Sequence, residues 1–262
     1  MPVPSTAYCY DFKILENEQV APQMMRLRLE CPELARSIEP GQFMNLRVPG
    51  DPSEILRLPF SWSCKDAEAG WVEFAYLVIG KGTERLAGLP AGTTSDLLGP
   101  AGHGWQVPAG AKRAMVVGGG SGVVPVVPLV GALREAGVAC DFVQGAPTAA
   151  RVIYEKEICE GGAELFVSTD DGTRGTHGFT TAVAEKLLDE HDYDVVFTCG
   201  PQPMMRGIWK LAEAHGVACQ VSMEKLMACG FGVCTTCLCE TIMGRKGACM
   251  DGPVFDAAEV IW

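Results

Sequence analysis

The sequence lacks an excess of basic residues. Its 262 residues include 21 Lys and Arg against 32 Asp and Glu, for a formal net charge of −11. This charge argues against a nucleic-acid backbone as partner, because such binding depends on a basic surface. The first fifteen residues also lack the basic region and apolar run of an export signal. With twelve cysteines, we therefore expect reduced thiols and a cytoplasmic protein rather than a disulfide framework.

The chain has few long stretches without charge, and one of them, Ala114–Leu133, is interrupted by glycine and proline. Twenty uncharged residues are enough to cross a bilayer. Glycines at 118–120 and 122 and prolines at 125 and 128 instead predict a buried strand, a glycine loop and a short helix over Val123–Ala136. We expect no membrane partner.

The first hundred residues show mostly period-two hydrophobicity. Alternating or apolar β-prone segments are separated by Pro and Gly, with possible turns near Glu33–Ser37 and after Thr83. Such a pattern predicts a small antiparallel β-barrel over residues 1–100. The expected strands are Cys9–Leu15, Met25–Glu30, Phe43–Val48 and Trp71–Ile79.

The period changes after Gly99–Gly110, which has the composition of a linker. Strands and helices then alternate, which predicts a parallel sheet covered on both faces over residues 101–222. Further strands are expected at Arg113–Val117, Ala139–Gly145, Glu164–Thr169, Asp194–Thr198 and Ala218–Ser222, with helices at Thr180–Glu190 and Pro203–His215.

Residues 223–262 form a cysteine-rich segment. Cys229, Cys234 and Cys237 are separated by four and two residues, and Cys249 follows after eleven more. This spacing is that of plant-type 2Fe-2S ferredoxins. A structural zinc site also uses four thiolates, although it usually contains two C-x-x-C pairs. Cys239 alternates with Cys237 as on a short strand, so we interpret it as a bystander.

Two motifs in the barrel suit a flavin. The run Arg57-Leu58-Pro59-Phe60-Ser61 offers a cation, apolar surface and a hydroxyl, while Tyr76-Leu77-Val78 leads into a glycine turn at Gly82 and Thr83. A guanidinium can pair with a pyrophosphate, and amides at a helix start attract phosphate. An edge strand with an exposed Arg, or a simple hairpin, would look the same.

Two further motifs suit a nucleotide. The loop Gly118, Gly119, Gly120, Ser121 and Gly122 follows a strand, and small residues there let a pyrophosphate rest on a helix N-terminus, although the dinucleotide fingerprint G-x-G-x-x-G is not met. Cys199, Gly200, Pro201 and Met204 leave another strand at its carboxyl end, where open α/β sheets bind ligands. Cys199 could equally be a buried core thiol.

Taken in order along the chain, the motifs resemble those of the ferredoxin-reductase superfamily. They are Arg57-x-Pro-Phe-Ser, Gly80-Lys-Gly-Thr, Gly118-Gly-Gly-x-Gly, Cys199-Gly-Pro-x-Pro-Met and the cysteine cluster with Cys249-Met-Asp-Gly-Pro. The chain most resembles the electron-transfer subunits of NAD-linked dihydroorotate dehydrogenases. The resemblance implies a β-barrel FAD domain, an α/β NAD domain and a 2Fe-2S segment. The implied FAD residues are Leu58–Ser61, Tyr76–Val78, Gly82 and Thr83, with iron at Cys229, Cys234, Cys237 and Cys249.

The resemblance also implies an electron relay. Family members often carry basic residues where Leu58 and Leu77 stand, which leaves Arg57 as the expected phosphate cation. A separate FMN-containing subunit would oxidise dihydroorotate, and electrons would run through the cluster and FAD to NAD+ in a heterotetramer. His103, His177, His191 and His215 are expected on the surface or in turns rather than in acid-base roles.

Two other functions fit the same sequence. The first is an NAD(P)H-flavin reductase subunit that exchanges electrons with ferredoxin, sulfide or polysulfide. The second is a nucleotide-sensing or zinc-stabilised binding module. Arg151 or Arg174 could meet the 2′-phosphate of NADPH, but both also suit solvated loops.

Overall fold

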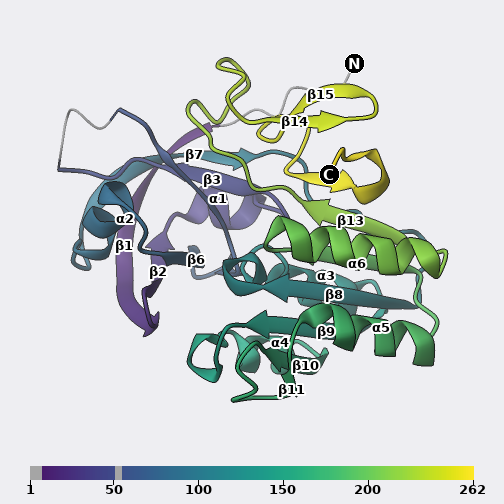
Figure 1. The fold of residues 1–262 in the computed structure, drawn as a ribbon. Helices are drawn as coiled ribbons and strands as arrows, with labels where there is room; N and C mark the ends of the chain where they lie inside the picture. Colours follow the sequence, from purple (N-terminus) through teal and green to yellow (C-terminus); the bar gives the residue numbers. More distant parts are fainter. Residues whose placement is uncertain (1–7, 51–54) are drawn as a thin grey trace.

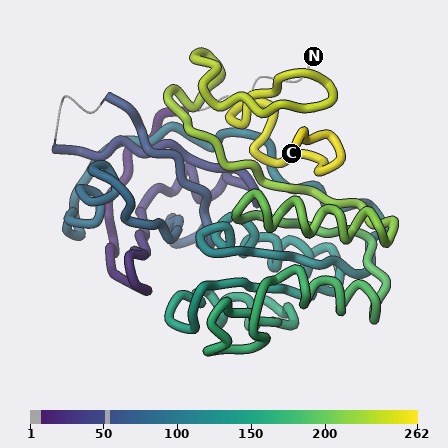
Figure 2. The backbone as a smooth tube through the Cα atoms, in the orientation of Figure 1, coloured from purple at the N-terminus to yellow at the C-terminus, as the bar shows by residue number. Residues whose placement is uncertain are grey.

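The computed structural model describes residues 8–50 and 55–262. Within these residues the chain forms an antiparallel sheet, a mostly parallel sheet and a two-stranded hairpin (Figure 1). The two large sheets lie next to each other, and the C-terminal segment that includes the hairpin runs along their common upper side in this view (Figures 1 and 2). Residues 1–7, which begin the segment without an export signal, lie outside the description.

The antiparallel sheet has the strand order β4-β3-β7-β1-β2-β6-β5, and all its pairings are antiparallel. Its inward side chains include Leu27, Met44, Leu46, Phe74 and Leu97, all fully buried in one core. The expected barrel is therefore confirmed as a seven-stranded sheet in the described residues. Its elements are β1 Tyr8–Ala21, β2 Met24–Glu30, α1 Pro32–Ser37, β3 Phe43–Leu46, β4 Leu58–Ser61, β5 Cys64–Asp66, β6 Trp71–Leu77, α2 Lys81–Ala87 and β7 Thr94–Ala101.

The second sheet has the order β11-β10-β9-β8-β12-β13-β16, parallel except for β16. Its elements are β8 Arg113–Gly119, η1 Gly120–Val123, α3 Val127–Glu135, β9 Ala139–Ala146, η2 Ala149–Arg151, α4 Glu155–Glu160, β10 Glu164–Thr169, β11 Thr176–His177, α5 Thr180–Glu190, β12 Val195–Cys199, α6 Gln202–Ala214, β13 Ala218–Ser222, β16 Val254–Asp256 and η3 Ala257–Glu259.

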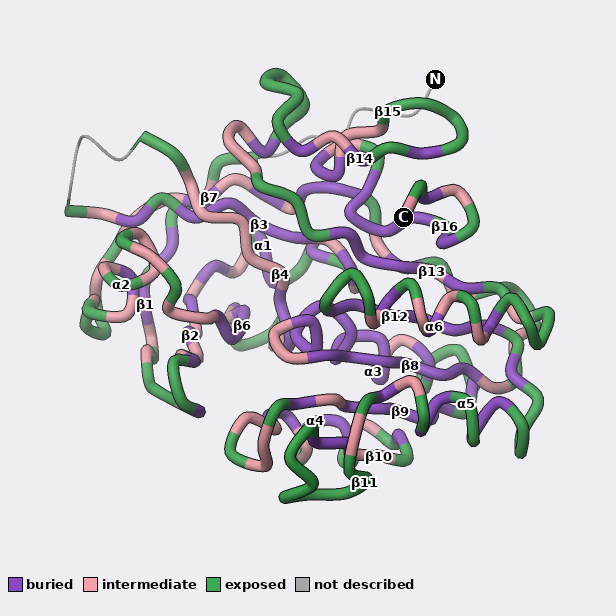
Figure 3. The backbone as a smooth tube through the Cα atoms, viewed as in Figure 1, coloured by how far each residue is buried: buried purple, intermediate pink, exposed green. Residues whose placement is uncertain are grey.

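Helices cover both faces of this sheet, as expected for a parallel sheet. Along β8, Ala114 and Val116 pack in the core that includes α3 and α4, whereas Met115 and Val117 pack in the core that includes α5 and α6. Both sets of side chains are fully buried, and β8, β9 and β12 are buried along nearly their whole length (Figure 3). The sheet thus fixes the carboxyl ends of β8 and β12 side by side.

The helix expected over Val123–Ala136 begins later than the sequence pattern indicates. A 3₁₀ turn occupies Gly120–Val123, and the α-helix starts at Val127 with a proline in its first turn. Pro125 and Pro128 lack an N–H group and therefore favour the beginning of a helix over its interior. The glycine loop therefore leads into a tight turn rather than directly onto an α-helix N-terminus.

The expected linker Gly99–Gly110 also differs from the structure. Its first three residues belong to β7, and Trp105 is 7% exposed, with its indole N–H donating to the Pro125 carbonyl at 2.9 Å. The segment is a packed connection between the two sheets.

The C-terminal segment returns to the second sheet after leaving it. The hairpin of β14 Leu238–Thr241 and β15 Gly244–Gly247 is followed by β16, which pairs antiparallel with β13. Trp262 stacks on Trp209 of α6 with a ring-centroid distance of 5.7 Å. These contacts attach the cysteine segment to the α/β part.

None of the helices in the described ranges combines the length and apolarity needed to cross a membrane. The twelve cysteines all lie in those ranges and are free thiols. The four histidines are exposed, in agreement with the expectation from the sequence.

Candidate functional site

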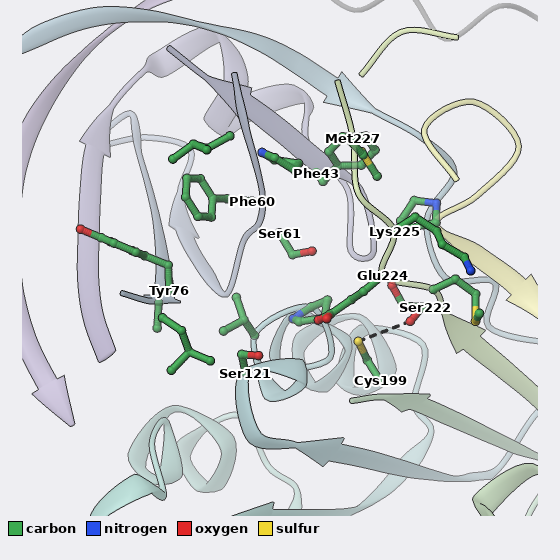
Figure 4. A pocket seen from close by; sticks show the side chains of 18 of the residues that line it. Phe43, Phe60, Ser61, Tyr76, Ser121, Cys199, Ser222, Glu224, Lys225 and Met227 are labelled. Atoms are coloured by element: carbon green, nitrogen blue, oxygen red, sulfur yellow. Dashed lines mark hydrogen bonds between the residues drawn. The ribbon is translucent and has the colours of Figure 1, made fainter. Parts of the chain in front are cut away.

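One cavity of about 380 Å³ lies where the barrel, the α/β sheet and the cysteine segment meet (Figure 4). Its walls come from β4 with the end of β6, the start of α2, the loop at η1, the carboxyl end of β12 and the segment that follows β13, and Phe43 and Pro253 complete them. Such a concave site at the carboxyl ends of parallel strands is where open α/β sheets bind ligands. The cavity is therefore the candidate functional site.

Most of the residues predicted to bind flavin line this cavity. The aromatic wall consists of Phe60 and Tyr76, whose ring centroids lie 5.4 Å apart, and Phe60 stacks on the buried Phe74 at 4.7 Å. Figure 4 shows the Ser61 hydroxyl group on the open side of this wall. The predicted residues that line the cavity are Leu58, Pro59, Phe60, Ser61, Tyr76, Leu77 and Thr83.

Val78 and Gly82 instead shape the turn beside the cavity. The Val78 amide donates to the Gln23 carbonyl at 2.9 Å. The Thr83 hydroxyl accepts hydrogen bonds from the amides of Ile79, at 3.0 Å, and Gly80, at 3.1 Å. Thr83 thus caps the start of α2 through its side chain.

Arg57 is not among the lining residues. Its guanidinium pairs with the Asp96 carboxylate, and its Nη1 donates to the Asp96 carbonyl at 3.1 Å. Arg47 Nε lies 3.3 Å from the same carboxylate. Burial alone would raise the pKa of Asp96, but the hydrogen bond and the charge of Arg57 outweigh burial and hold that pKa below its usual value. The sequence did not reveal Asp96 as the partner of these arginines.

The structure brings the two predicted nucleotide motifs together. Gly118 pairs with Cys199 across β8 and β12. A Cβ atom on Gly122 would lie 2.4 Å from the Cys199 carbonyl oxygen, and one on Gly119 would lie 2.4 Å from Met204 Sδ and 3.2 Å from the Pro201 ring. Only glycine allows backbone segments to approach so closely. Through Gly119 and Gly122 the glycine loop therefore packs against the turn at Cys199, Gly200, Pro201 and Met204, whereas a Cβ atom on Gly120 would meet nothing within 4 Å.

Of the nine residues in these two nucleotide motifs, Ser121 reaches the cavity wall beside Val124 and Pro125, which follow the loop, and Cys199 reaches it from the end of β12. The side chain of Cys199 is fully buried, and its Sγ donates to the Ser222 carbonyl at 3.5 Å. Burial raises the pKa of the Cys199 thiol well above its usual value. The thiol therefore stays protonated, so its contribution is shape and a weak hydrogen bond.

Arg151 and Arg174 both have partners in the structure. The Arg174 guanidinium pairs with the Glu155 carboxylate, and Arg151 Nη2 donates to the Gln23 side chain at 3.0 Å. Between them, the turn after β10 is closed by the Thr173 hydroxyl, which donates to Asp171 at 2.6 Å. Arg174 is therefore neutralised by an ion pair, whereas the partner of Arg151 is an uncharged amide.

The four predicted cluster cysteines occupy one folded segment. Cys237 and Cys249 are 3% and 1% exposed, whereas Cys229 is half-buried and Cys234 is exposed. Much of the segment between β13 and β14 is exposed and projects from the molecule (Figure 3). The amides of Phe231 and Cys234 both donate to Cys229 Sγ at 3.5 Å. In the described residues, no three metal-ligating side chains are already gathered at binding distance.

This segment nevertheless has the donor chemistry of an iron-sulfur site, with four thiols on one segment and amides directed at sulfur. Hydrogen bonds from Thr236, followed by those at Cys229, lower the pKa of the Cys234 thiol to about 6. Burial, followed by the neighbouring Cys237, raises the pKa of Cys249 to about 12. Because thiols bind metals as thiolates, filling the site would release a proton from Cys249.

The segment between β13 and the cysteines contributes wall residues that sequence analysis missed. Glu224, Lys225 and Met227 line the cavity, and Figure 4 shows the Glu224 side chain extending into it toward Ser121. Although the residue as a whole is exposed, burial around its carboxyl group raises the pKa of Glu224. The sequence could have identified these wall residues by the position of Met223–Met227, which lies between the end of a predicted strand and the first cluster cysteine.

Comparison with known proteins agrees with this arrangement. A model of the iron-sulfur cluster binding domain of dihydroorotate dehydrogenase B matches residues 224–261. A chain in the solved structure of an NADH-dependent reduced ferredoxin-NADP oxidoreductase, studied for flavin-based electron bifurcation, superimposes with a TM-score of 0.88 at 30% identity. That match covers 96% of this chain and 90% of the other. The ferredoxin-reductase-like fold class expected from the sequence is confirmed.

Curated relatives extend the match over nearly the whole chain. The dihydroorotate dehydrogenase B (NAD+) electron transfer subunit of Fusobacterium nucleatum is 34% identical over 256 residues, which cover 95% of this chain and 97% of the relative. The subunit of the same name from Bacillus caldolyticus is 40% identical over 229 residues, covering 85% and 87%. With identity of this extent at both the barrel and the cysteine segment, the chain belongs to the family of dihydroorotate dehydrogenase B electron transfer subunits.

Proposed function

We propose that this protein transfers electrons from a dihydroorotate-oxidising subunit through a 2Fe-2S cluster and FAD to NAD+. The observation that carries the proposal is the shared cavity, whose walls come from the barrel, the nucleotide motifs and the segment leading into the cysteines. A flavin bound there would lie between a nicotinamide and a cluster. When bound, FAD supplies the conversion between two-electron and one-electron transfer, and the protein supplies position and electrostatics.

For FAD we propose the residues that the sequence singled out, with roles given by the geometry. Phe60 and Tyr76 offer an aromatic wall, Ser61 offers a hydrogen-bonding hydroxyl at the open side, and Thr83 orders the turn. The proposed set is Arg57, Leu58, Pro59, Phe60, Ser61, Tyr76, Leu77, Val78, Gly82 and Thr83. Because Arg57 is paired with Asp96, it would contact an FAD phosphate from within that ion pair.

For NAD(H) we propose the packed pair of turns at Gly118, Gly119, Gly120, Gly122 and at Cys199, Gly200, Pro201, Met204. Their backbones meet where β8 and β12 end, and the carboxyl ends of parallel strands are where open α/β sheets bind dinucleotides. For the cluster we propose Cys229, Cys234, Cys237 and Cys249 as ligands.

We propose corresponding domain limits of 1–100 for FAD, 101–222 for NAD and 223–262 for the cluster. We also propose the cytoplasm as the compartment, because all twelve cysteines are free and an iron-sulfur site needs reduced thiols. The expected partner is an FMN-containing catalytic subunit, in a heterotetramer with two copies of each chain. The relatives' name, electron transfer subunit of dihydroorotate dehydrogenase B, supports this partner.

Co-expression with such a catalytic subunit tests the proposal. The complex should contain FAD and two iron atoms per copy of this chain, and should reduce NAD+ when dihydroorotate is added. A colourless chain without iron or flavin would favour a nucleotide-sensing or zinc-stabilised module. A fully loaded complex that is inactive with dihydroorotate would contradict the substrate.

A second function is favoured by one observation, the 0.88 TM-score with the ferredoxin-NADP oxidoreductase chain. In that case the electron partner would be ferredoxin rather than a dihydroorotate-oxidising subunit. The same preparation decides between them: this chain alone, loaded with its cofactors, would reduce ferredoxin with NADH but show no dependence on the FMN subunit. Sulfide or polysulfide would be assayed in parallel.

A further inference from the structure

The side chain of Asn45 is buried without the hydrogen bonding that such a group requires. Asn45 is 2% exposed, and its Nδ2 has no hydrogen-bond partner in the described part of the chain. Buried side-chain amides are nearly always paired, since an unpaired donor loses its bonds to water without replacement. A buried, unpartnered donor suggests a ligand acceptor that joins when the protein is loaded.

Asn45 lies on the face of β3 that is turned toward the cysteine segment. Residues alternate along β3, which pairs with β4 in regular register, and the register shift in its pairing with β7 between Phe43 and Asn45 places the extra residue on β7. Met44 and Leu46 point into the barrel core, whereas Phe43 packs in the second core together with Cys237 and Cys249. Two residues after Phe43, Asn45 shares that outward face.

The side chain of Asn45 packs against the loop that carries the first cluster cysteine. A Cβ atom on Gly230 would lie 2.5 Å from Asn45 Nδ2 and 2.7 Å from both its Cγ and its Oδ1, so the amide plane lies flat on Gly230. Gly230 has a φ of +76° and is adjacent to Cys229. Cys229 Sγ already accepts two backbone amides at 3.5 Å.

We propose that the Asn45 side-chain amide donates a hydrogen bond to the Cys229 thiolate when the four cysteines hold the cluster. The inference rests on the proposed function, because it requires the cluster. An N–H donor at a ligating sulfur stabilises the added negative charge of the reduced form and so raises the reduction potential. Asn45 is thus a positioning residue that joins β3, next to flavin-lining β4, to the cluster loop.

The first test is a redox titration of the holoprotein followed by electron paramagnetic resonance. Asn45→Leu keeps a similar volume but removes the donor, and the reduction equilibrium of the cluster should shift at least tenfold toward the oxidised form, or about 59 mV for one electron. The flavin potential, read from absorbance, should stay unchanged. Ser168→Ala is the matched control, because Ser168 is also buried with an unpaired hydroxyl but lies on β10, separated from β16 by four strands.

The second test is read first in the wild-type protein and so gives a result even where Asn45→Leu does not fold. Asn17 and Asn45 are the two asparagines of the sequence. Asn17 Nδ2 donates to the carbonyls of Leu86, at 2.8 Å, and Leu89, at 2.9 Å, beside α2. In cluster-reconstituted protein made with side-chain ¹⁵N asparagine, pulsed resonance of the reduced cluster should detect one coupled ¹⁵N, retained in Asn17→Ala and lost in Asn45→Leu.

The outcomes separate the two proposals. Wild-type protein that holds no iron overturns the proposed function and with it this inference. Loaded wild-type protein without ¹⁵N coupling overturns the inference about Asn45 alone. An Asn45→Leu variant that keeps the wild-type cluster potential does the same. If that variant fails to fold, the labelled wild-type protein still decides.

Discussion

At the scale of single residues, Asp96 is a carboxylate of the barrel that two arginines, Arg47 and Arg57, share. It accepts the guanidinium of Arg57 and lies 3.3 Å from Arg47 Nε, and its backbone carbonyl accepts from both residues. The folded protein therefore holds the Asp96 carboxylate in its ionised form, with a lowered pKa. Its stabilising effect is present above the usual pKa of about 3.9 and disappears as the pH falls through the lowered value.

Asp96→Asn should therefore lower the free energy of unfolding at pH 7 by about 1–3 kcal/mol, as expected for hydrogen bonds to a charged group. The deficit should shrink as the pH falls below about 4. Urea unfolding at several pH values measures it, with Asp192→Asn at an exposed position as the control. An equal deficit at pH 3 and pH 7 would rule out the charge as the cause.

The backbone around Gly122 leaves no space for a side chain at this position. A Cβ there would meet the Cys199 carbonyl oxygen at 2.4 Å and Gly200 Cα at 2.6 Å, both of them backbone atoms that cannot rotate away. Gly122→Ala should cost about 1–3 kcal/mol of stability by overpacking and should weaken NADH binding. Chemical unfolding and NADH titration of the flavin-loaded protein measure both effects.

The control for Gly122 is Gly131→Ala, in the interior of α3. A Cβ there has no neighbour within 4 Å, so this variant should gain about 0.5–1 kcal/mol from helix propensity. If the two alanine variants change the free energy of unfolding equally, the close approach of Gly122 to the turn at Cys199 does not contribute to stability.

Residues of the candidate site could be predicted from the sequence where all of them belong to one short motif. The run Leu58–Ser61 lines the cavity because it makes up β4, the strand that lies along the cavity. The pairing of Arg57 with Asp96 was not predictable, because 39 residues separate the partners and only the sheet brings them together. Asn45 and Glu224 were missed for the same reason.

At the scale of elements, β10, α5 and β13 were predicted with their observed bounds, whereas β1 continues to Ala21, past the expected end at Leu15, and β7 was not predicted. Short strands such as β11 and β16 were missed, since two or three residues carry no period. Their existence depends on pairing with strands distant in the sequence. The pairing of β16 with β13 is the clearest case, because it holds the cysteine segment to the α/β sheet.

Phe255 is the anchor of β16 in this pairing. It is 5% exposed, packs in the core that includes Cys237 and Cys249, and its ring would touch a Cβ on Gly252 at 2.4 Å. Phe255→Ala should cost about 3–5 kcal/mol. Because the turn that carries Cys249 loses its packing, iron content per folded chain should fall as well.

The matched control for Phe255→Ala is Phe166→Ala on β10. Phe166 packs against the same core, but four strands of the sheet separate β10 from β16. Phe166→Ala should lower the unfolding midpoint while iron per folded chain stays at the wild-type level. Equal iron loss in both variants would mean that cluster loading follows overall stability rather than the anchoring of β16.

At the scale of the whole molecule, the two large sheets must keep a fixed relation, because the cavity takes its walls from both. Polar contacts join the barrel to the region around α4. The Ser63 hydroxyl and the Tyr154 hydroxyl are hydrogen-bonded at 2.8 Å, and Arg151 donates to Gln23 at 3.0 Å. Tyr154 has a φ of 62°, an unfavourable left-handed conformation for a tyrosine, which its burial and this contact maintain.

Tyr154→Phe tests whether this joint positions the cofactors. The ring stays buried, and Ser63 still donates to the Glu73 carbonyl at 3.0 Å, so the cost in stability should be only about 1 kcal/mol. The rate of flavin reduction by NADH should nevertheless fall several-fold, because hydride transfer requires the nicotinamide and the flavin to be placed with sub-ångström precision. Stopped-flow absorbance of the FAD-loaded protein measures that rate.

Tyr193→Phe provides the comparison, since the Tyr193 hydroxyl bonds to the Asp141 carboxylate entirely within the α/β part. Its variant also loses one buried phenol hydrogen bond, but it leaves the joint between the sheets intact. The rate of flavin reduction should therefore stay near the wild-type value in Tyr193→Phe and fall several-fold in Tyr154→Phe. Equal rates in the two variants would show that the cavity keeps its geometry without the Ser63–Tyr154 contact, and that the remaining contacts between the two sheets, including Arg151 to Gln23, set their relation.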